Sequence, residues 1–220
     1  MLWSTPMSAA TTEKSTAFER CVETVLEETV GLLAKPAGPE PTLFEKLSAI
    51  ARQAGFEAEA LLGRGGMGAV IKAQDRNLNR PVALKFLTLT DRKAGELGDL
   101  KIEAERMARL VHENVVQVYS WHQVGELTFF CMEYVEGETL ASRARRHPPL
   151  KVRDTLRIIL EALNGIEAAH RLGILHRDIK PENIIISNSG RVKVADFGIA
   201  STSEEREREN KKRMISGTMG

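Results

Sequence analysis

The stretch that most constrains the fold of this 220-residue chain covers residues 176–198. It contains two short apolar runs on either side of the turn sequence Ser187–Gly190, and this pattern predicts a β-hairpin. A hairpin brings together the residues at its two outer ends, so we expect Asn183 and Asp196 to lie close to each other. Amide and carboxylate oxygens are hard ligands, so two such side chains held close together could bind a divalent cation.

A glycine-rich segment predicts a second strand–turn–strand unit earlier in the chain. Gly63, Gly65 and Gly68 precede the apolar run Val70–Ala73, which continues as a strand. Glycines at these positions let the backbone lie close over phosphates. A dinucleotide-binding fold uses a similar glycine string, but it needs a helix directly after the glycines, where this sequence predicts a strand.

A lysine in the next apolar segment is the third candidate. Lys85 has apolar neighbours on both sides within Pro81–Leu87, so its side chain is expected to face inward. A buried ammonium without a partner is costly, so an acidic partner is expected as well. The helical spacing of residues 100–111 offers Glu103 and Glu105 for this contact.

Taken in order, these segments resemble a eukaryotic-like serine/threonine protein kinase of the bacterial type. The resemblance covers residues 56–220 and rests on four motifs, which are G-x-G-x-x-G-x-V at 63–70, V-A-L-K at 82–85, H-R-D-x-K-x-x-N at 176–183 and D-F-G at 196–198. It implies an α+β, bilobal protein-kinase-like fold. The small lobe would hold an antiparallel sheet and the family's αC helix, and the large lobe would be incomplete and mainly helical.

The resemblance also implies a division of the chain into three parts. Residues 1–55 would form a helical N-terminal extension and linker. Residues 56–135 would form the small lobe, and residues 136–220 would form a partial large lobe with the catalytic and activation loops. Candidate phosphorylation sites in the activation loop are Thr202, Ser203 and Ser216.

Four side chains receive catalytic-loop or metal-binding roles from the resemblance. Asp178 would accept the proton of the attacking hydroxyl, and Lys180 would neutralise the phosphoryl group in transfer. Asn183 and Asp196 would hold Mg²⁺ against the nucleotide phosphates. A single tripeptide of this kind would leave room for a plainer interpretation, with His176 as a core histidine and the acids as solvated loop residues.

Lys85 and its acidic partner complete the implied catalytic set. Lys85 would pair with the α- and β-phosphates. We choose Glu103 as its partner from the spacing to the Leu110–Val116 stretch, which resembles the segment leaving the family's αC helix. Glu105 remains an alternative, and its other interpretation is an exposed i,i+4 partner of Arg109.

The implied nucleotide-binding residues come from both lobes. Val70 and Ala83 would cover the adenine from above, Ile185 would pack below it, and Met132 would lie behind it. The backbone of Glu133 and Val135 would hydrogen-bond the base. The full implied set is Leu62, Gly63, Gly65, Gly68, Val70, Ala83, Lys85, Met132, Glu133, Val135 and Ile185.

The first 55 residues precede every motif and carry two helical patterns. Capping boxes at Thr16-x-x-Glu19 and Thr42-x-x-Glu45 open them, and Pro36–Pro41 separates them. The apolar residues at helical spacing are Phe18, Val22, Leu26, Val30 and Leu33 in the first pattern, and Leu43, Leu47, Ile50 and Ala54 in the second. Residues 16–34 could dimerise or dock a partner; the alternative, which we favour, is an extension packed on the adjacent lobe or partly disordered.

A third helical pattern follows at residues 152–166. Its apolar stripe, which predicts a core helix of the larger lobe rather than a binding surface, consists of Val152, Leu156, Ile159, Leu160, Leu163 and Ile166. The family's later helices do not follow before Gly220. We therefore expect this helix and the 184–194 hairpin to be partly uncovered, and exposed apolar surface favours association.

Composition excludes several classes of protein. The net charge of +1 gives no global electrostatic reason for binding nucleic acid or an anionic membrane. No apolar run approaches the length of a membrane span, and the first residues lack the pattern of a signal peptide. Cys21 and Cys131 form no paired motif, which favours free thiols and a cytoplasmic location.

The sequence therefore favours an enzyme that transfers the γ-phosphoryl group of ATP to a serine or threonine hydroxyl of a protein, with Mg²⁺ as cofactor. Every catalytic side chain of the family is present, which argues against a decayed active site. The alternative is a catalytically silent nucleotide-binding or interaction fragment of a kinase, since the helices beneath the catalytic loop are missing.

Overall fold

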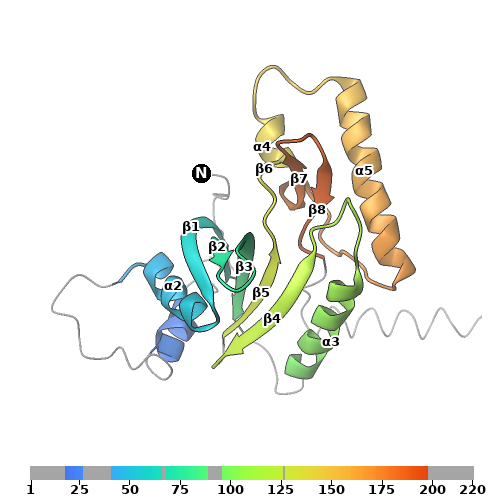
Figure 1. Cartoon of the computed structure of the whole chain (residues 1–220). Coiled ribbons are helices and arrows are strands. Elements are labelled where there is room, and N and C mark those ends of the chain that lie inside the picture. The colour runs from blue at the N-terminus through green and yellow to red at the C-terminus, as the bar shows by residue number, and fades with distance from the viewer. Residues whose placement is uncertain (1–17, 27–40, 66–67, 89–95, 126, 198–220) are drawn as a thin grey trace, which may run out of the picture.

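The structure is a computed structural model of the chain, and it describes residues 18–26, 41–65, 68–88, 96–125 and 127–197. Of these, the side chains of residues 88, 96–101 and 103 are not described. The described residues form two units (Figure 1). We call the five-stranded sheet with its helices the small lobe, and the unit above it, with three short strands and two helices, the large lobe.

The sheet of the small lobe is antiparallel and has the order β1-β2-β3-β5-β4. Its strands are β1 (Phe56–Gly65), β2 (Gly68–Asp75), β3 (Arg80–Thr88), β4 (Val118–Val124) and β5 (Leu127–Glu133). The glycine-rich segment joins β1 to β2, as predicted. Because a strand follows the glycines, the helix that a dinucleotide-binding fold requires at this point is absent from the described segment.

Helices cover both faces of this sheet. On β5, Phe129 and Cys131 belong to one apolar cluster, while Phe130 and Met132 belong to another. The second cluster includes buried residues of α3 (Glu96–Arg109), the helix expected as αC. Since successive side chains of a strand point to opposite faces, β5 is buried on both sides and reads as a continuous apolar run.

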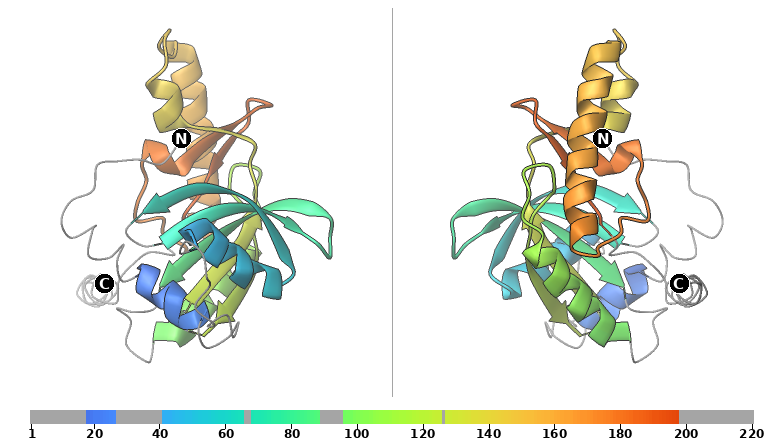
Figure 2. Two further views of the ribbon diagram at one scale, coloured as in Figure 1. Left: turned by 90° about the vertical axis from the view of Figure 1, so that its left-hand side faces the viewer. Right: turned by 90° about the vertical axis from the view of Figure 1, so that its right-hand side faces the viewer.

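The first cluster contains the N-terminal helices. Residues 18–26 are helical and bury Phe18 and Val22 against the sheet, and α2 (Leu43–Gln53) adds Leu47 and Ile50 (Figure 2, left). The predicted capping box of α2 is present, with Thr42 and Glu45 bonded reciprocally. The later part of the first helical pattern lies outside the described residues. The N-terminal helices therefore share one hydrophobic core with β1, β2, β3 and β5.

The large lobe holds the predicted hairpin. Its strands are β6 (Gly137–Thr139), β7 (Ile184–Ser187) and β8 (Val192–Val194), and its helices are α4 (Leu140–Ala144), α5 (Val152–Arg171) and the short 3₁₀ turn η1 (Pro181–Asn183). β7 pairs with both β6 and β8 in an antiparallel sheet. None of the helices in the described ranges is long and apolar enough to cross a bilayer.

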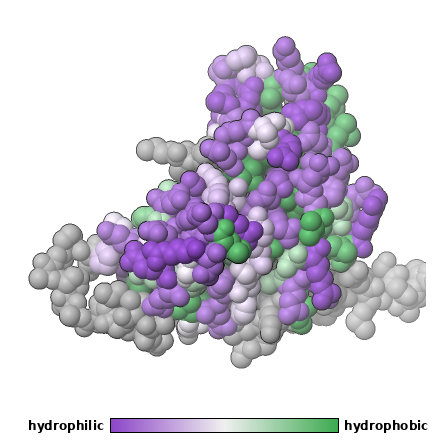
Figure 3. Space-filling model, in the orientation of Figure 1, coloured by the Kyte–Doolittle hydropathy of each residue, from purple (hydrophilic) through white to green (hydrophobic). Residues whose placement is uncertain are grey.

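The prediction that α5 is a core helix holds for one face only, and the helix is partly uncovered, as expected. Of the predicted stripe Ile166 is buried, but five residues are exposed, namely Val152, Leu156, Ile159, Leu160 and Leu163. Hydrophobic surface lines the edge of the molecule along this helix (Figure 3). The helix buries Ile158, Ala162, Gly165, Ile166 and Ala169 instead. A Cβ on Gly165 would lie 2.5 Å from the Asn114 carbonyl oxygen, so the small residues let α5 approach the chain closely. Periodicity favours the larger apolar side chains and misses this requirement.

The shared core predicts that the N-terminal helical segment is needed for stability. Phe18→Ala removes a fully buried ring and should lower the free energy of unfolding by about 3–5 kcal/mol, measured by urea denaturation. Arg20→Ala on the exposed side of the same helical segment is the control, and its effect should stay within about 0.5 kcal/mol. Equal, small effects of both variants would contradict the shared core.

Candidate active site

The loop between α5 and β7 gathers three of the predicted catalytic-loop residues. Lys180 Nζ lies 2.6 Å from Asp178 Oδ2. The Asn183 side-chain amide donates to the Asp178 carbonyl at 2.8 Å and to Asp178 Oδ2 at 3.2 Å. Asn183 is buried, whereas the Asp178 side chain is 56% exposed. The buried Asn183 therefore holds Asp178 in place, while the Asp178 carboxylate remains accessible to a substrate.

The turn after β8 brings Asp196 to the small lobe. Lys85 on β3 places its Nζ 2.7 Å from Asp196 Oδ1, and both side chains are largely buried. Asp196 and Arg177 have positive φ angles of 64° and 66°, an uncommon conformation for residues other than glycine. Such strained backbone persists where surrounding contacts impose it, and it is concentrated at functional sites.

Glu103 was the predicted partner of Lys85, and its side chain lies outside the described residues. Its backbone is in α3, and the alternative candidate Glu105 is exposed. The described contact of Lys85 is with Asp196, which the sequence analysis assigned to a metal ion. The pairing with Glu103 thus stays a prediction.

His176 connects the catalytic loop to the turn that carries Asp196. Its buried ring accepts a hydrogen bond from the Asp178 N–H at Nδ1 (3.3 Å), so the proton of the neutral ring is on Nε2, which donates to the Ala195 carbonyl at 2.8 Å. The ring lies 4.6 Å from that of Phe197, centroid to centroid. Burial lowers the pKa of His176, and the Ala195 carbonyl and the nearby acids oppose this shift.

Sequence reasoning gave His176 no role beyond a possible place in the core. It is in the core, and it also fixes two site loops relative to each other. Which residues of these two loops are buried could not be predicted from the sequence, because neither loop has a regular spacing of apolar residues.

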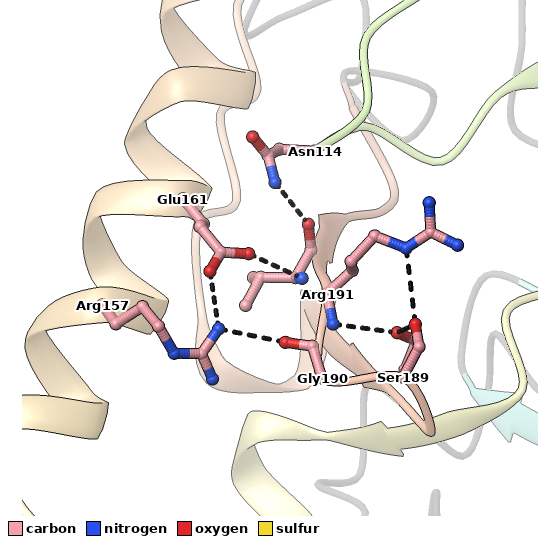
Figure 4. A network of polar contacts seen from close by, with 8 residues as sticks. Asn114, Arg157, Glu161, Ser189, Gly190 and Arg191 are labelled. Carbon is pink, nitrogen blue, oxygen red and sulfur yellow. Dashed lines mark hydrogen bonds and ion pairs between the residues drawn. The ribbon is translucent and has the colours of Figure 1, made fainter.

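The hairpin that carries Asn183 and Asp196 is fastened to α5 by polar contacts (Figure 4). Glu161 accepts the Val192 N–H at 3.0 Å, and Arg157 bonds both Glu161, at 2.5 Å, and the Gly190 carbonyl, at 3.0 Å. On the other side, the Asn114 side chain donates to the Val192 carbonyl at 2.8 Å. Side-chain hydrogen bonds to the N–H and the carbonyl of Val192 therefore fix the position of the hairpin along α5.

The predicted glycines lie on the β1–β2 hairpin of the small lobe. Gly65 pairs with Gly68 in the strand register, and Gly63 pairs with Val70. Gly68 has φ +147°, and a Cβ at this position would lie 1.9 Å from the Phe86 carbonyl oxygen. Glycine is therefore required at 68 because β3 passes directly beneath it. At Gly65 a Cβ would meet nothing within 4 Å.

The apolar residues predicted to enclose a base come together in one cluster across both lobes. Ala83 and Met132 are buried members of it, and the partly buried residues packed against it include Leu62, Val70, Val135 and Ile185. Ala83 and Met132 are direct neighbours in the β3–β5 register. Six of the predicted binding residues, far apart in sequence, thus contribute to a single apolar region next to Lys85 and Asp196.

The two predicted metal ligands are also adjacent. The Ala195 N–H donates to the Asn183 backbone carbonyl at 2.8 Å, which fixes Asn183 beside the residue that precedes Asp196. The Asn183 amide nitrogen is bonded to Asp178, so its side-chain oxygen is the atom that can face a cation. One carboxylate and one amide oxygen suit Mg²⁺, which completes its shell with phosphates and water. Asn183 and Asp196 therefore offer oxygen ligands of the kind that Mg²⁺ requires.

The protein kinase domain family matches residues 56–219. The serine/threonine-protein kinase PknL of Mycobacterium tuberculosis is 39% identical over 147 residues, which cover 66% of this chain and 36% of PknL. PrkC of Bacillus subtilis is 38% identical over 147 residues, covering 66% of this chain and 23% of PrkC. The chain thus matches little more than a third of these relatives' length, or less.

One solved protein structure has a similar fold over most of this chain. The crystal structure of Rad53 1-466 in complex with AMP-PNP aligns with a TM-score of 0.61 and 25% sequence identity. The alignment covers 70% of this chain and 42% of Rad53 1-466. The helical segment of residues 18–26 and α2 lie before the start of the family match at residue 56.

Protonation of His176 should make stability depend on pH. The folded state lowers its pKa below 6.5, so the neutral ring contributes fully above that pH, and the free energy of unfolding falls as the pH drops further. We expect His176→Gln to flatten this fall as the pH drops below about 6.5. His122, whose pKa burial also lowers, accounts for a separate part, which His122→Gln removes. Identical pH profiles of wild type and His176→Gln would contradict the burial of a neutral ring.

The contact at Gly68 predicts a difference between two glycines of one hairpin. Gly68→Ala should lower the free energy of unfolding by about 1–3 kcal/mol or more, because of its φ angle and the Phe86 carbonyl. Gly65→Ala is the matched control and should cost less than about 1 kcal/mol. Thermal unfolding of both variants tests this, and equal tolerance at both positions would refute the close approach of β3.

Proposed function

The chain belongs to the protein kinase family, and we propose from this premise that it transfers the γ-phosphoryl group of ATP to a serine or threonine hydroxyl of a protein. The observation that carries the proposal is the meeting of Asp178, Lys180 and Asn183 with Asp196 and Lys85 from another part of the chain. The names of PknL and PrkC, both serine/threonine-protein kinases, support the choice of hydroxyl.

Asp178 acts in this proposal as the base. Lys180 and Asn183 both contact Oδ2 of its carboxylate, so Oδ1 is the oxygen that meets the substrate hydroxyl. The hydroxyl oxygen bonds to the γ-phosphorus, the bond from that phosphorus to the bridging oxygen breaks, and ADP leaves. The hydroxyl proton passes to Asp178. Lys180, whose ammonium lies 2.6 Å from Asp178 Oδ2, neutralises the phosphoryl oxygens during transfer in this proposal.

Asn183 and Asp196 hold Mg²⁺ in this proposal. The ion supplies positive charge against the phosphate oxygens when it is bound. Lys85 neutralises the α- and β-phosphates, and its present contact with Asp196 places its ammonium beside the same region. Glu103 on α3 is kept as the proposed second partner of Lys85.

The nucleotide base is placed in the apolar region between the lobes. In this proposal Val70 and Ala83 cover the base, Ile185 packs beneath it and Met132 lies behind it, with Leu62 also at the site; all five belong to or pack against the same apolar cluster. The Glu133 N–H already donates to the Gln117 carbonyl at 2.8 Å, so the proposal assigns the base to the Glu133 carbonyl and to the backbone of Val135. Binding of AMP-PNP by the structurally similar Rad53 supports a nucleotide at this position.

The proposal includes several further predictions from the sequence. A protein substrate and a cytoplasmic location are proposed, as is the division into parts 1–55, 56–135 and 136–220. A dimer through residues 16–34 is not favoured, because Phe18, Cys21, Val22 and Val25 of this segment are buried in the chain's own core. The activation-loop residues Thr202, Ser203 and Ser216 lie outside the described residues.

A second candidate function is a nucleotide-binding or interaction module without catalysis. The exposed apolar side of α5 favours it, because Val152 is 77% exposed and Leu160 is 62% exposed. Contiguous apolar surface of this kind marks a place where another protein surface can bind.

Asp178→Asn distinguishes the two candidates. Loss of the base should lower ³²P transfer from Mg-ATP to a generic basic protein about 10²–10⁴-fold. Mg-ATP affinity, measured by calorimetry, should change less than about threefold, because the nucleotide contacts other residues. Asp154→Asn on the first turn of α5 is the control for charge.

Each outcome has a distinct meaning. Transfer that persists in Asp178→Asn at the wild-type rate rejects the proposed mechanism. Nucleotide binding without transfer in wild type and in both variants supports the silent module.

A further inference from the structure

A charged contact lies directly behind the segment proposed to hold the base. Lys193 of β8 places its Nζ 2.9 Å from Glu133 Oε2 and donates to the Val115 carbonyl at 3.2 Å. The same Glu133 oxygen accepts the Gln117 N–H at 3.2 Å. The two side chains are only 14% and 25% exposed. A pair buried to this extent is poorly screened and geometrically defined, unlike an exposed ion pair.

The pair joins the two segments between which the nucleotide is proposed to lie. Glu133 is the last residue of β5, where the chain crosses from the small lobe to the large lobe. Lys193 is directly opposite Ile185 in the β7–β8 register, and it precedes Asp196 by three residues. Cross-strand neighbours lie on the same face of a sheet, so Lys193 and Ile185 share the face turned toward the hinge.

Backbone bonds run alongside this ion pair. The Val116 N–H donates to the Val194 carbonyl at 2.9 Å, and the Val194 N–H donates to the Asn114 carbonyl at 2.8 Å. The Glu133 N–H in turn donates to the Gln117 carbonyl. Residues 114–117 therefore connect β8 to the end of β5. Lys193 is the side chain that touches both this connection and Glu133.

The β7–β8 hairpin, which carries Lys193, is itself fixed in place. Glu161 and Asn114 hold the backbone of Val192, next to Lys193, against α5 (Figure 4). Because these bonds hold the hairpin against α5, a change in the length or charge of the side chain at 193 moves the hinge and not the hairpin.

We propose that Lys193 is a positioning residue, which through Glu133 sets the distance between the base-binding hinge and the hairpin that carries Ile185 and Asp196. The role rests on the proposed nucleotide site. A ligand that contacts both the hinge and this hairpin depends on this distance, as Mg-ATP and adenosine do in the proposed site, whereas Mg-tripolyphosphate does not contact the hinge.

The test compares three probes, namely Mg-ATP, adenosine and Mg-tripolyphosphate, by calorimetric competition. Lys193→Met should weaken Mg-ATP on the order of tenfold, since it disturbs the relative placement of two binding elements. Adenosine, which contacts both the hinge and Ile185, should weaken as well, Mg-tripolyphosphate should change less than about twofold, and Lys193→Arg should restore most of the Mg-ATP affinity. Lys151→Met, an exposed lysine before α5, is the control.

A second variant separates positioning from stability. Lys193→Met leaves the Glu133 carboxylate buried without its ammonium, which destabilises the fold. Glu133→Gln/Lys193→Met removes both charges and should recover the melting temperature, while Mg-ATP stays weakened. Hydrogen exchange without nucleotide should be faster at the amides of Val116 and Glu133 in both variants, with the amides between β2 and β3 unchanged.

The outcomes distinguish this role from the proposed function. Failure of wild type to bind Mg-ATP would overturn the nucleotide site, and the positioning role with it. Normal wild-type binding, with the same loss for Mg-tripolyphosphate as for Mg-ATP in Lys193→Met, would overturn the positioning role alone. Unchanged exchange at Val116 and Glu133 would also overturn it, whatever the affinities.

Discussion

A lysine on β3 and an aspartate just beyond β8 form the ion pair on which the arrangement of the site depends. Lys85 belongs to the sheet of the small lobe, and Asp196 belongs to a strained turn of the large lobe. Neither charge could be buried alone at acceptable cost, so each fixes the position of the other. His176 ties the same turn to the catalytic loop, which brings Asp178 under this constraint as well.

The small lobe is stabilised in part by residues that precede the family match. The helical segment of residues 18–26 and α2 cover one face of the sheet, and α3 covers the other. A sheet buried on both sides holds β3 rigidly, and Lys85 and Ala83 lie on this strand. The burial of both faces therefore supports the site, although the N-terminal helices contribute no residue to it. The large lobe is different, because one side of α5 remains exposed.

The success of each sequence-based prediction follows from how local its cause is. The β7–β8 hairpin and the capping box of α2 depend on a few consecutive residues, and both formed as predicted. Which face of α5 is buried depends on what the helix packs against: the small residues around Gly165 permit the close approach, while the larger apolar stripe stays mostly exposed, as expected for a partly uncovered helix. The contact between Lys85 and Asp196 joins residues 111 positions apart (196 − 85), a distance that no periodic pattern reports.

The sequence by itself determined the family resemblance, the strand after the glycines and the candidate residues, because motif spacing and local periodicity are properties of short segments. Tertiary structure decided which candidates meet. It paired Lys85 with Asp196, assembled six apolar residues from both lobes into one region, and placed Lys193 against Glu133. These contacts arise because two separately formed units pack in one arrangement, in which buried charges must find partners and small residues permit close approach.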